Sequence, residues 1–450
     1  MKSPAINRDF ILLFMVMLTI AAGNTALQSV LPALGRELKV ADSAVAASFS
    51  VSALLWVVAA PFWANRSDRH GRRAMILLGI GGFSISLALC GLFLAAGING
   101  WISGTAAFIC FIAGRLVYGT FGAAAPPAVQ ALVAGRTSRE ERTRALTLLG
   151  SAFGLGTILG PAIAPNLILG SIGAVTLGLS GPAFLFALFG AGMFIAVLRR
   201  LPNDVTPQPG THGAANAYPS IGGQSSGASV TAATEPHTEH VGYSDPRIRA
   251  WMIVGLVMGH AQAMTGQAIG FLVIDRLHVA PTEALQPTGL VLMMGAGAAL
   301  LVQWGIIPLL DLKPRQLVLT GLVFASAGCA MTGLASSLYG IATAYALASI
   351  GFGFIRPGFT AGSSLAVGHA AQGSVAGKVT SINGAAFVLG PSIGVGLYEA
   401  RHALPYLTAS AALVLMFGYA WMALRDPLVD ALRPARPELA GGDEPYGLDR

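Results

Sequence analysis

Charged residues are scarce in this chain of 450 residues. Only 10% of them are Asp, Glu, Lys or Arg and 54% are hydrophobic, whereas charged residues make up ~25% of ordinary soluble domains. The mean hydropathy of +0.67 reflects the same imbalance. So little charge cannot cover a water-facing surface. The composition therefore excludes a water-soluble globular protein.

Cysteine is scarce as well, and its placement excludes two further classes of protein. Cys90, Cys110 and Cys329 all lie in apolar stretches, so they form neither a disulfide framework nor a zinc site. His237 and His240 have the spacing of metal ligands, but an isolated histidine pair in a polar stretch is ordinarily solvated. We therefore predict no metal and no cofactor.

Long apolar segments are what the chain has in abundance. A helix needs ~20 apolar residues to cross the hydrocarbon of a bilayer, and twelve segments meet this requirement with some latitude at their ends. The predicted spans are 10–33, 45–64, 74–96, 102–130, 145–169, 174–198, 250–274, 287–310, 316–337, 339–366, 376–399 and 403–424.

Basic residues are distributed unevenly between the loops. If both termini lie in the cytoplasm, 21 of the 27 Lys and Arg residues lie on that side, and only Arg36, Lys39, Arg276 and Arg401 lie outside. Short loops rich in Lys and Arg remain cytoplasmic. We therefore predict a multi-pass protein of a bacterial-type inner (plasma) membrane, whose partner is the lipid bilayer and not nucleic acid.

A polar stretch divides the chain into two halves. Residues 201–246 are rich in Gly, Ser, Thr, Ala, Pro and His and contain no Lys or Arg, the composition of a flexible tether. The predicted organisation is an N-terminal six-helix bundle at 1–200, a flexible cytoplasmic linker at 201–246, a C-terminal six-helix bundle at 247–426 and a cytoplasmic tail at 427–450.

The two halves repeat one another in sequence. Residues 151–163 (SAFGLGTILGPAI) and 381–393 (SINGAAFVLGPSI) share six of thirteen positions at an offset of 230, and a weaker echo pairs Arg36 with Arg276. A duplicated six-helix unit makes a site between its halves that opens to each side in turn. The predicted fold class is an all-α membrane protein with twelve transmembrane helices in two pseudo-symmetric six-helix bundles.

The first predicted inner loop, PFWANRSDRHGRR at 61–73, concentrates charge. Asp68 lies near the inner end of the second span, where an acid facing the N-terminus of the eleventh gains ~0.3–1 kcal/mol. Gly71 permits a tight turn, and Arg72 and Arg73 can pair with acids or anionic headgroups. The alternative is that these arginines only enforce the topology.

This loop resembles the cytoplasmic signature of the major facilitator superfamily, Gly-x-x-x-Asp-Arg-x-Gly-Arg-Arg/Lys, with Ala64 in place of the first glycine. The matching residues are Asp68, Arg69, Gly71, Arg72 and Arg73. In the fourth span, Arg115, Gly119, Gly122 and Ala123 look like the second motif of the family. The resemblance implies the fold of that superfamily and a loop that acts as a conformational latch.

The fifth span looks like the antiporter motif of the same family, although Ala164 and Pro165 stand where a closing glycine pair is usual. The residues concerned are Gly150, Gly154, Gly156, Gly160 and Pro161, and Gly390 and Pro391 repeat the last two in the eleventh span. Glycines at these spacings leave bare backbone on one helix face, so the helix can pack closely. The chain is most similar to the twelve-span drug:proton antiporters, a group with multidrug and tetracycline exporters, in which this helix rocks during export.

Two arginines, Arg115 and Arg356, are predicted inside spans. An arginine at the centre of a spanning helix costs ~2.5–3.5 kcal/mol unless something offsets it. Each could face a central cavity and meet an anionic group, or could bond structurally to its neighbours. Asn24 and Gln28 are the buried polar groups of the first span, and we assign them to the same cavity.

Acidic residues are absent from the depth of every predicted span, so the group that carries a coupling proton is not obvious. His260 is mid-membrane and can titrate near neutrality, although a lone histidine in a span is more often a neutral core residue. Asp275, Glu399 and Asp9, at the ends of spans, are the other candidates. We count His260 among the cavity residues.

The predicted function is a secondary active transporter that exports a small amphipathic compound or drug, anionic or neutral, by alternating access. Its partners are the substrate and protons, and we expect a monomer. One alternative is a proton symporter that imports a carboxylate metabolite, because the same arginines would serve it. A second is a membrane sensor that transports nothing. An enzyme is not predicted, because the spans contain no nucleophile with a base and no paired acids.

Overall fold

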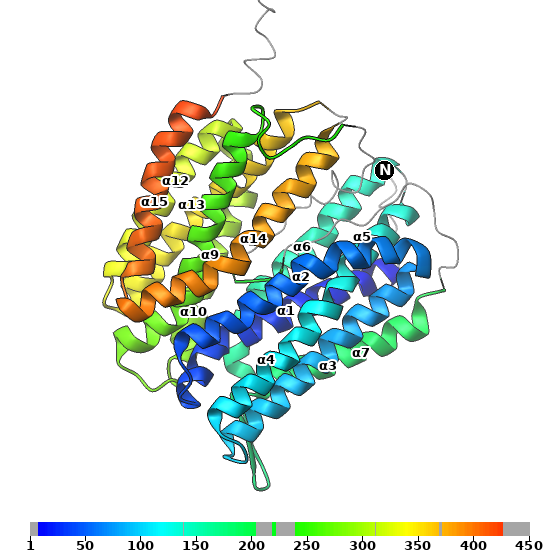
Figure 1. Ribbon diagram of the computed structural model, residues 1–450, viewed down its shortest axis with the longest axis vertical. Coiled ribbons are helices and arrows are strands. Elements are labelled where there is room, and N and C mark those ends of the chain that lie inside the picture. The colour runs from blue at the N-terminus through cyan, green and yellow to red at the C-terminus, as the bar shows by residue number, and fades with distance from the viewer. Residues whose placement is uncertain are drawn as a thin grey trace, which may run out of the picture.

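The computed structural model is a set of long helices packed side by side (Figure 1). It describes residues 8–137, 139–203, 218–221, 239–310, 312–368 and 371–425, without the side chains of residues 68, 69, 139, 140, 143 and 144. The predicted tail at 427–450 and most of the predicted linker at 201–246 lie outside the described residues.

The described residues of the first half form six long helical runs and a small hairpin. Pro126 and Pro127 stand at the start of α5, where their missing amide hydrogens coincide with a short 3-10 turn that interrupts the α-helix of the fourth span. The elements are α1 (Arg8–Glu37), α2 (Asp42–His70), α3 (Arg72–Ile98), α4 (Gly104–Phe121), the 3-10 helix η1 (Gly122–Ala124), α5 (Ala125–Arg136), α6 (Arg139–Ile163), the 3-10 helix η2 (Ala164–Leu167), β1 (Leu169–Ile172), β2 (Val175–Gly178) and α7 (Gly181–Arg200).

Six further helical runs are described in the second half. Ser337 caps α13 by accepting a hydrogen bond from the amide of Gly340, as Ser103 caps α4 in the first half. The elements are α9 (Arg249–Leu277), α10 (Leu285–Leu300), the π-helical segment η3 (Leu301–Ile306), α11 (Ile307–Leu310), α12 (Pro314–Leu334), α13 (Leu338–Leu365), α14 (Gln372–Ala400) and α15 (Leu404–Ala423).

Eleven helices of the described part are long and apolar enough, by length and composition, to cross a membrane. The twelfth run, α9, has 29 residues and is long enough, but its middle carries His260, Gln262 and Gln267. Large apolar side chains such as Leu188 and Leu415 are 70% and 76% exposed on the outer faces, as lipid contact requires. The predicted all-α membrane fold is therefore confirmed.

A two-stranded hairpin lies between α6 and α7, so the predicted spans 145–169 and 174–198 were wrong at their facing ends. β1 and β2 are antiparallel, with Ile172 opposite Val175. Gly173 lies in the turn with a φ of 62°, a conformation that glycine adopts at no steric cost. The apolar residues here alternate with glycine and polar residues, a strand pattern that the composition of a sliding window does not distinguish from a helix end.

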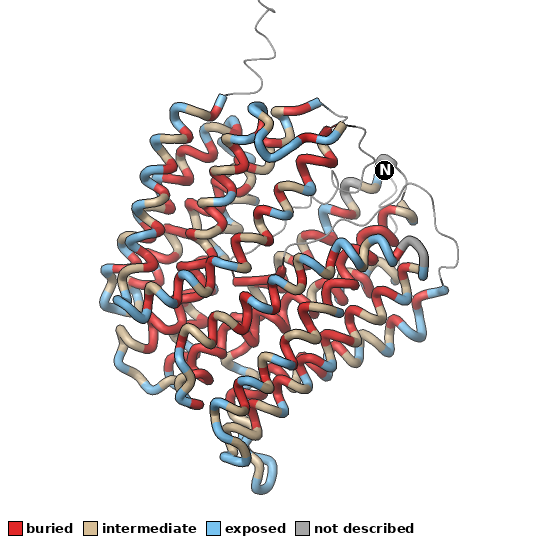
Figure 2. The backbone as a smooth tube through the Cα atoms, in the orientation of Figure 1, coloured by how far each residue is buried: buried red, intermediate tan, exposed pale blue. Residues whose placement is uncertain are grey.

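The helices form two groups, α1–α7 and α9–α15, which meet along the middle of the molecule (Figure 1). The buried residues concentrate where helices face one another, and the exposed residues follow the outer faces and the ends (Figure 2). We call the end that carries the β1–β2 hairpin the hairpin end. We call the opposite end the arginine-rich end, because Arg72, Arg136, Arg200 and Arg249 lie at helix ends there.

The same pair of contacts recurs in both groups. Gly160 of α6 packs against α1, where an added Cβ would collide with the carbonyl oxygen of Ala22 and the side chain of Thr25. Gly390 of α14 packs against α9, where an added Cβ would lie 2.6 Å from the Cβ of Ala263. Each pair joins the first and fifth spans of one half, so the repeat in sequence is a repeat in packing.

Candidate functional site

Arg115 lies in the centre of the first group of helices and is fully buried. Its Nη2 donates to the Oδ1 of Asn24 at 2.6 Å and to the hydroxyl of Tyr218. Its guanidinium carbon also lies 4.9 Å from the ring centres of Phe49 and of Tyr118. Within the described part of the chain, Nε and Nη1 have no hydrogen-bond partner. The arrangement is a buried cation held by neutral groups, which favours an anionic or polar ligand.

Asn24 and Gln28 lie one turn apart on α1 and face the same region. The Nε2 of Gln28 donates to the Oε1 of Gln267 on α9 at 2.6 Å. Both side chains are buried, with exposed fractions of 0% for Asn24 and 3% for Gln28. This amide pair joins the two groups of helices in the middle of the molecule, where the sequence predicts the cavity.

Arg356 occupies a comparable place in the second group. Its Nη2 donates to the Oε1 of Gln262 on α9, and its Nη1 donates to the Oδ1 of Asn383 on α14 at 3.3 Å. Arg356 and Gln262 line a cavity together with Thr157 of α6 and Tyr345 of α13. Each half thus contributes one buried arginine to this central region, and in each half an amide of the first span accepts a hydrogen bond from it.

Gln262, Gln267 and Asn383 were missed in the sequence analysis. A signal for two of them exists, because Gln262 and Gln267 follow Asn24 and Gln28 by 238 and 239 positions, close to the 240 that separate Arg36 from Arg276. Polar residues at corresponding places of the two repeats point to the shared site. Trp56, which packs its ring against Tyr118 at 5.3 Å, also borders this region.

The described hydrogen bond of His260 involves neither of the two arginines. Its Nδ1 is 2.8 Å from the carbonyl oxygen of Leu256, one turn earlier on α9. The side chain is half-buried, and this bond stays within its own helix. The structure therefore does not bring His260 into the hydrogen bonds of Arg115 or Arg356 that we describe.

The loop between α2 and α3 turns at Gly71, whose φ of 89° explains the glycine. Arg73 donates to the carbonyl of Leu198 at 2.6 Å and to the side chain of Asn203, so it caps the C-terminus of α7. Arg72 is buried. The side chains of Asp68 and Arg69 lie outside the described residues, and the contact predicted for Asp68 is not described.

Arg315 repeats the part of Arg73 in the second half. It donates to the carbonyls of Leu424 at 3.0 Å and of Trp421 at 2.9 Å, at the C-terminus of α15. In both halves, therefore, an arginine at the start of the third span caps the end of the sixth. This shared contact is structural and needs no ligand.

The glycines of α6 differ in their surroundings. Gly156 and Gly160 lie against the backbone of α1, whereas an added Cβ at Gly154 would meet nothing within 4 Å. Gly150 is buried in the same helix. Pro161 and Pro391 both lie inside their helices, α6 and α14. Two of the four motif glycines thus form the close contact that the sequence predicts.

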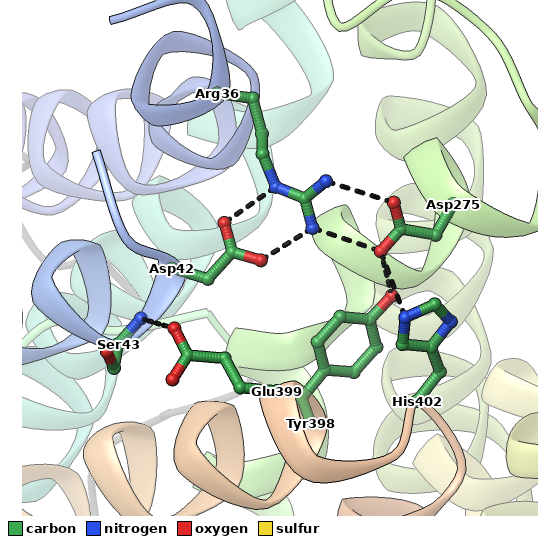
Figure 3. A network of polar contacts seen from close by, with 7 residues as sticks. All are labelled: Arg36, Asp42, Ser43, Asp275, Tyr398, Glu399 and His402. Carbon is green, nitrogen blue, oxygen red and sulfur yellow. Dashed lines mark hydrogen bonds and ion pairs between the residues drawn. The ribbon is translucent and has the colours of Figure 1, made fainter. Parts of the chain in front are cut away.

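A network of charged side chains joins the two groups at the hairpin end (Figure 3). Arg36 of α1 donates to both oxygens of Asp42 at 2.7 and 2.5 Å, and to both oxygens of Asp275 of α9 at 3.1 and 3.0 Å. The hydroxyl of Tyr398 of α14 donates to Asp275 at 2.6 Å. Asp275 is therefore a carboxylate shared between helices of both halves.

Two further groups complete this network. The amide of Ser43 donates to Glu399 of α14 at 2.8 Å, a second link between the halves. The Nε2 of His402 lies 3.6 Å from Asp275. Asp275 and Glu399 are recognisable in the sequence as titratable candidates, but their connection to Arg36 is not. Asp9, the remaining candidate, forms an ion pair of 2.8 Å with Arg136 within the first half.

Metal ligands do not gather in the described ranges, where no group of three or more His, Cys, Asp or Glu residues could hold an ion. Cys90 and Cys329 are buried, and Cys110 is half-buried, all as free thiols. His237 lies outside the described residues. The polar centre of the molecule is thus built from arginine, amide and hydroxyl groups.

Comparison with known proteins adds two kinds of likeness in sequence. The profile described as Major Facilitator Superfamily matches residues 13–391. The tetracycline resistance protein of class E from Escherichia coli is 32% identical over 190 residues, or 41% of this chain and 44% of that protein. Multidrug resistance protein 2 of Bacillus subtilis is 35% identical over 115 residues, or 26% of this chain and 25% of that protein. The chain therefore matches less than half the length of either relative.

Solved structures extend the likeness over the whole chain. A bacterial homologue of the human lysosomal transporter Spinster, in an inward-facing and occupied conformation, covers 96% of this chain and 100% of its own, with a TM-score of 0.71 and 12% identity. The human organic anion transporter MFSD10 covers 93% of this chain and 100% of its own, with a TM-score of 0.61 and 19% identity. At these identities the structures show a shared fold.

Proposed function

The chain belongs to the major facilitator superfamily and is a membrane transporter, and from this premise we propose that it exports a small amphipathic compound, anionic or neutral, in exchange for protons. The transport site is the polar centre between the two halves, formed by Asn24, Gln28, Arg115 and Arg356 with Gln262 and Gln267. His260 stays a candidate at its margin.

The observation that carries this proposal is the bonding of Arg115. It is fully buried, its described hydrogen-bond partners are neutral, and two of its guanidinium nitrogens have no hydrogen-bond partner in the described ranges. A desolvated cation without a counter-charge repels a cationic substrate and attracts an anion or a strong acceptor. Arg356, buried in the opposite half, acts in the same direction.

Alternating access is supported by where the halves touch. Among the described residues, the hydrogen bonds and ion pairs between their helices link Arg36 with Asp275, Ser43 with Glu399, Ser50 with Ser392, and Gln28 with Gln267. These contacts extend from the hairpin end to the middle. The conformation is thus closed at the hairpin end, and the cycle requires these contacts to break as the halves rock about the centre.

Asp275 is the best placed candidate for proton coupling. It faces Arg36 and Tyr398, with Asp42, Glu399 and His402 in the same network. A proton on Asp275 removes the negative charge that holds Arg36 across the halves, so proton binding and opening of the hairpin end are linked. A carboxylate confined to one half would lack this effect.

Asp275→Asn tests the coupling. We expect the variant to exchange labelled for unlabelled substrate across a vesicle membrane at a rate near that of the wild type, but to lose uphill transport driven by a pH gradient. Asp9→Asn is the matched control, because Asp9 pairs with Arg136 inside one half, and it should keep uphill transport. Uphill transport by Asp275→Asn would place the proton elsewhere.

Export rather than import is supported by the relatives, which are named as tetracycline and multidrug resistance proteins. Inverted membrane vesicles with an acidic lumen should accumulate substrate if the chain exports, because protons then leave the lumen in exchange for the substrate that enters. Accumulation in intact cells alone would instead support a symporter that imports carboxylates. The two preparations therefore separate the proposal from its alternative.

The charge of the substrate can be tested with matched dyes. Fluorescein is an anionic xanthene, and a rhodamine ester is a cationic xanthene of similar size. We expect inverted vesicles that contain the protein to accumulate fluorescein at least ~10-fold faster than the rhodamine ester, since 1.4 kcal/mol of discrimination corresponds to this factor. Preferential transport of the rhodamine ester would contradict the argument from Arg115.

The placement in the cell is part of the same proposal. We assign the chain to the inner membrane of a bacterium as a monomer, with both termini in the cytoplasm and the halves divided at 201–246. A reporter that is active only in the cytoplasm, fused after residue 450, should be active. If that reporter is inactive, and a reporter that is active only in the periplasm is active at the same position, the orientation is the reverse of the one proposed.

A further inference from the structure

Four residues of the stretch between α7 and α9 lie in the centre of the molecule. Tyr218, Pro219, Ser220 and Ile221 are all buried, and the exposed fractions of Tyr218 and Ser220 are 1% and 2%. A polar connecting stretch ordinarily runs over the surface. We call these residues the inserted segment.

The side chain of Tyr218 is held on every side by the transport site. Its hydroxyl accepts a hydrogen bond from Arg115 and lies 3.2 Å from the Oδ1 of Asn24 and 3.3 Å from the Oγ of Ser52. Its ring meets Trp56 edge-on at 5.7 Å and Tyr118 at 5.8 Å. Arg115, Asn24 and an aromatic wall thus bind an aryl hydroxyl group.

The backbone of the inserted segment uses the remaining polar groups of α1. The Nδ2 of Asn24 donates to the carbonyl of Pro219 at 2.5 Å, and the amide of Ile221 donates to the Oε1 of Gln28 at 3.0 Å. Ile221 also lines the cavity that contains Arg356. The segment therefore occupies the groups that a substrate needs.

Both described flanks of the stretch lie at the arginine-rich end. Asn203 accepts from Arg73, and the amide of Val241 donates to Ser374, near the start of α14, at 3.2 Å. The hairpin end, by contrast, is closed by the Arg36 network. The described residues before and after the inserted segment thus lie at the arginine-rich end, the side from which the substrate comes in the proposed export.

Taking the proposed transport site as its premise, we propose that Tyr218–Ile221 is a tethered occupant that competes with the substrate and must withdraw before transport, and that the site favours substrates with an aromatic hydroxyl. A linked ligand acts at an effective concentration on the order of millimolar. Even weak binding of the inserted segment therefore keeps the site largely filled. Substrate affinity is lowered in proportion to the fraction of protein in which the site is free.

Binding to the purified full-length protein in detergent tests this inference without any transport. The probe is 1-naphthol, with 1-methoxynaphthalene as the analogue that lacks the hydroxyl proton. We expect Tyr218→Ala to bind 1-naphthol at least ~10-fold more tightly than the wild type, because the free fraction of the site rises. Tyr218→Phe, which keeps the ring, should gain less, and 1-methoxynaphthalene should bind more weakly to all three proteins.

Tyr243→Ala is the matched control. Tyr243 belongs to the same connecting stretch, is 50% exposed and lies outside the central site, so its loss should leave naphthol binding unchanged. A synthetic peptide of residues 214–225 should displace naphthol from Tyr218→Ala, and the same peptide with alanine at position 218 should not. Because the competition is measured on Tyr218→Ala with naphthol bound, the naphthol binding itself shows that this variant is folded.

Equal or weaker naphthol binding by Tyr218→Ala would overturn the inference, because Tyr218 would then be a fixed part of the site. Failure of the peptide to compete would overturn it as well. Neither result depends on transport. A protein that moves no dye in vesicles but gains affinity through Tyr218→Ala would contradict the proposed export and support the tethered occupant.

Discussion

Arg115 is the residue from which we infer the charge of the substrate, and its burial is energetically unfavourable. The guanidinium is buried against Phe49 and Tyr118 and donates to Asn24. An arginine in mid-membrane costs ~2.5–3.5 kcal/mol unless offset. An arginine buried at such a cost, with no carboxylate partner among the described residues, is more useful for binding than for stability.

Arg115→Gln separates these two roles. The glutamine keeps a polar side chain but carries no charge, so we expect transport of fluorescein to fall at least ~10-fold while the midpoint of thermal unfolding in detergent stays level or rises. Arg136→Gln is the control, because its exposed ion pair with Asp9 contributes only ~0–1 kcal/mol. A large drop in the unfolding midpoint of Arg115→Gln would assign the arginine to the structure.

The sequence predicted the central residues unevenly, for a physical reason. Asn24, Gln28, Arg115 and Arg356 stand out because a polar group in an apolar run must be satisfied somewhere. What satisfies each group depends on which helix faces which, and no local pattern encodes this. His260 had the same signal, yet its bond closes on its own helix through Leu256.

At the scale of the helix, the close approach of α6 to α1 is the feature that we expect substitutions to disturb most. An added Cβ at Gly156 would lie 2.6 Å from the carbonyl oxygen of Leu18 and 2.7 Å from the Cβ of Ala21. Real Cβ atoms do not approach this closely, so any side chain here must push the two helices apart.

Gly156→Ala is therefore expected to destabilise the protein by ~1–3 kcal/mol, as overpacking does in other cores, and to slow transport. Gly154→Ala is the control on the same helix, since nothing lies within 4 Å of its added Cβ, and it should be neutral. Thermal unfolding in detergent and vesicle uptake measure the two effects. Equal behaviour of both variants would refute the packing argument.

The elements that the sequence predicted best are the long apolar helices, because length and hydropathy alone define them. The β1–β2 hairpin escaped prediction because its residues are apolar enough to extend the neighbouring spans. The burial of the inserted segment was not predicted for the opposite reason. Its neighbours in sequence are small and polar, and the burial of Tyr218 comes from contacts with helices that lie far away along the chain.

At the scale of the whole molecule, the two halves must separate at the hairpin end for the cycle to proceed. Ser50 of α2 and Ser392 of α14 have hydroxyl oxygens 2.7 Å apart across this interface. Replacing both with cysteine places two thiols at the distance and on the facing helices that a disulfide requires.

Ser50→Cys with Ser392→Cys should therefore form a disulfide under oxidation, hold the hairpin end closed and abolish transport, and a reductant should restore it. Each single substitution should transport normally under both conditions, which controls for effects of the oxidant on Cys90, Cys110 and Cys329. Vesicle uptake before and after reduction measures the effect. Full transport by the cross-linked protein would show that this interface does not open.

Arg36 binds a carboxylate of its own half, Asp42, and one of the opposite half, Asp275, at the same time. When the halves separate, the guanidinium of Arg36 retains its ion pair with Asp42 and is not left without a carboxylate. The ion pair that is lost, with Asp275, is bidentate and its carboxylate is only 16% exposed, but the pair with Asp42 offsets part of that loss. Separation of the halves therefore removes one of the two carboxylates from Arg36 and leaves the other, so the positive charge stays compensated throughout the cycle.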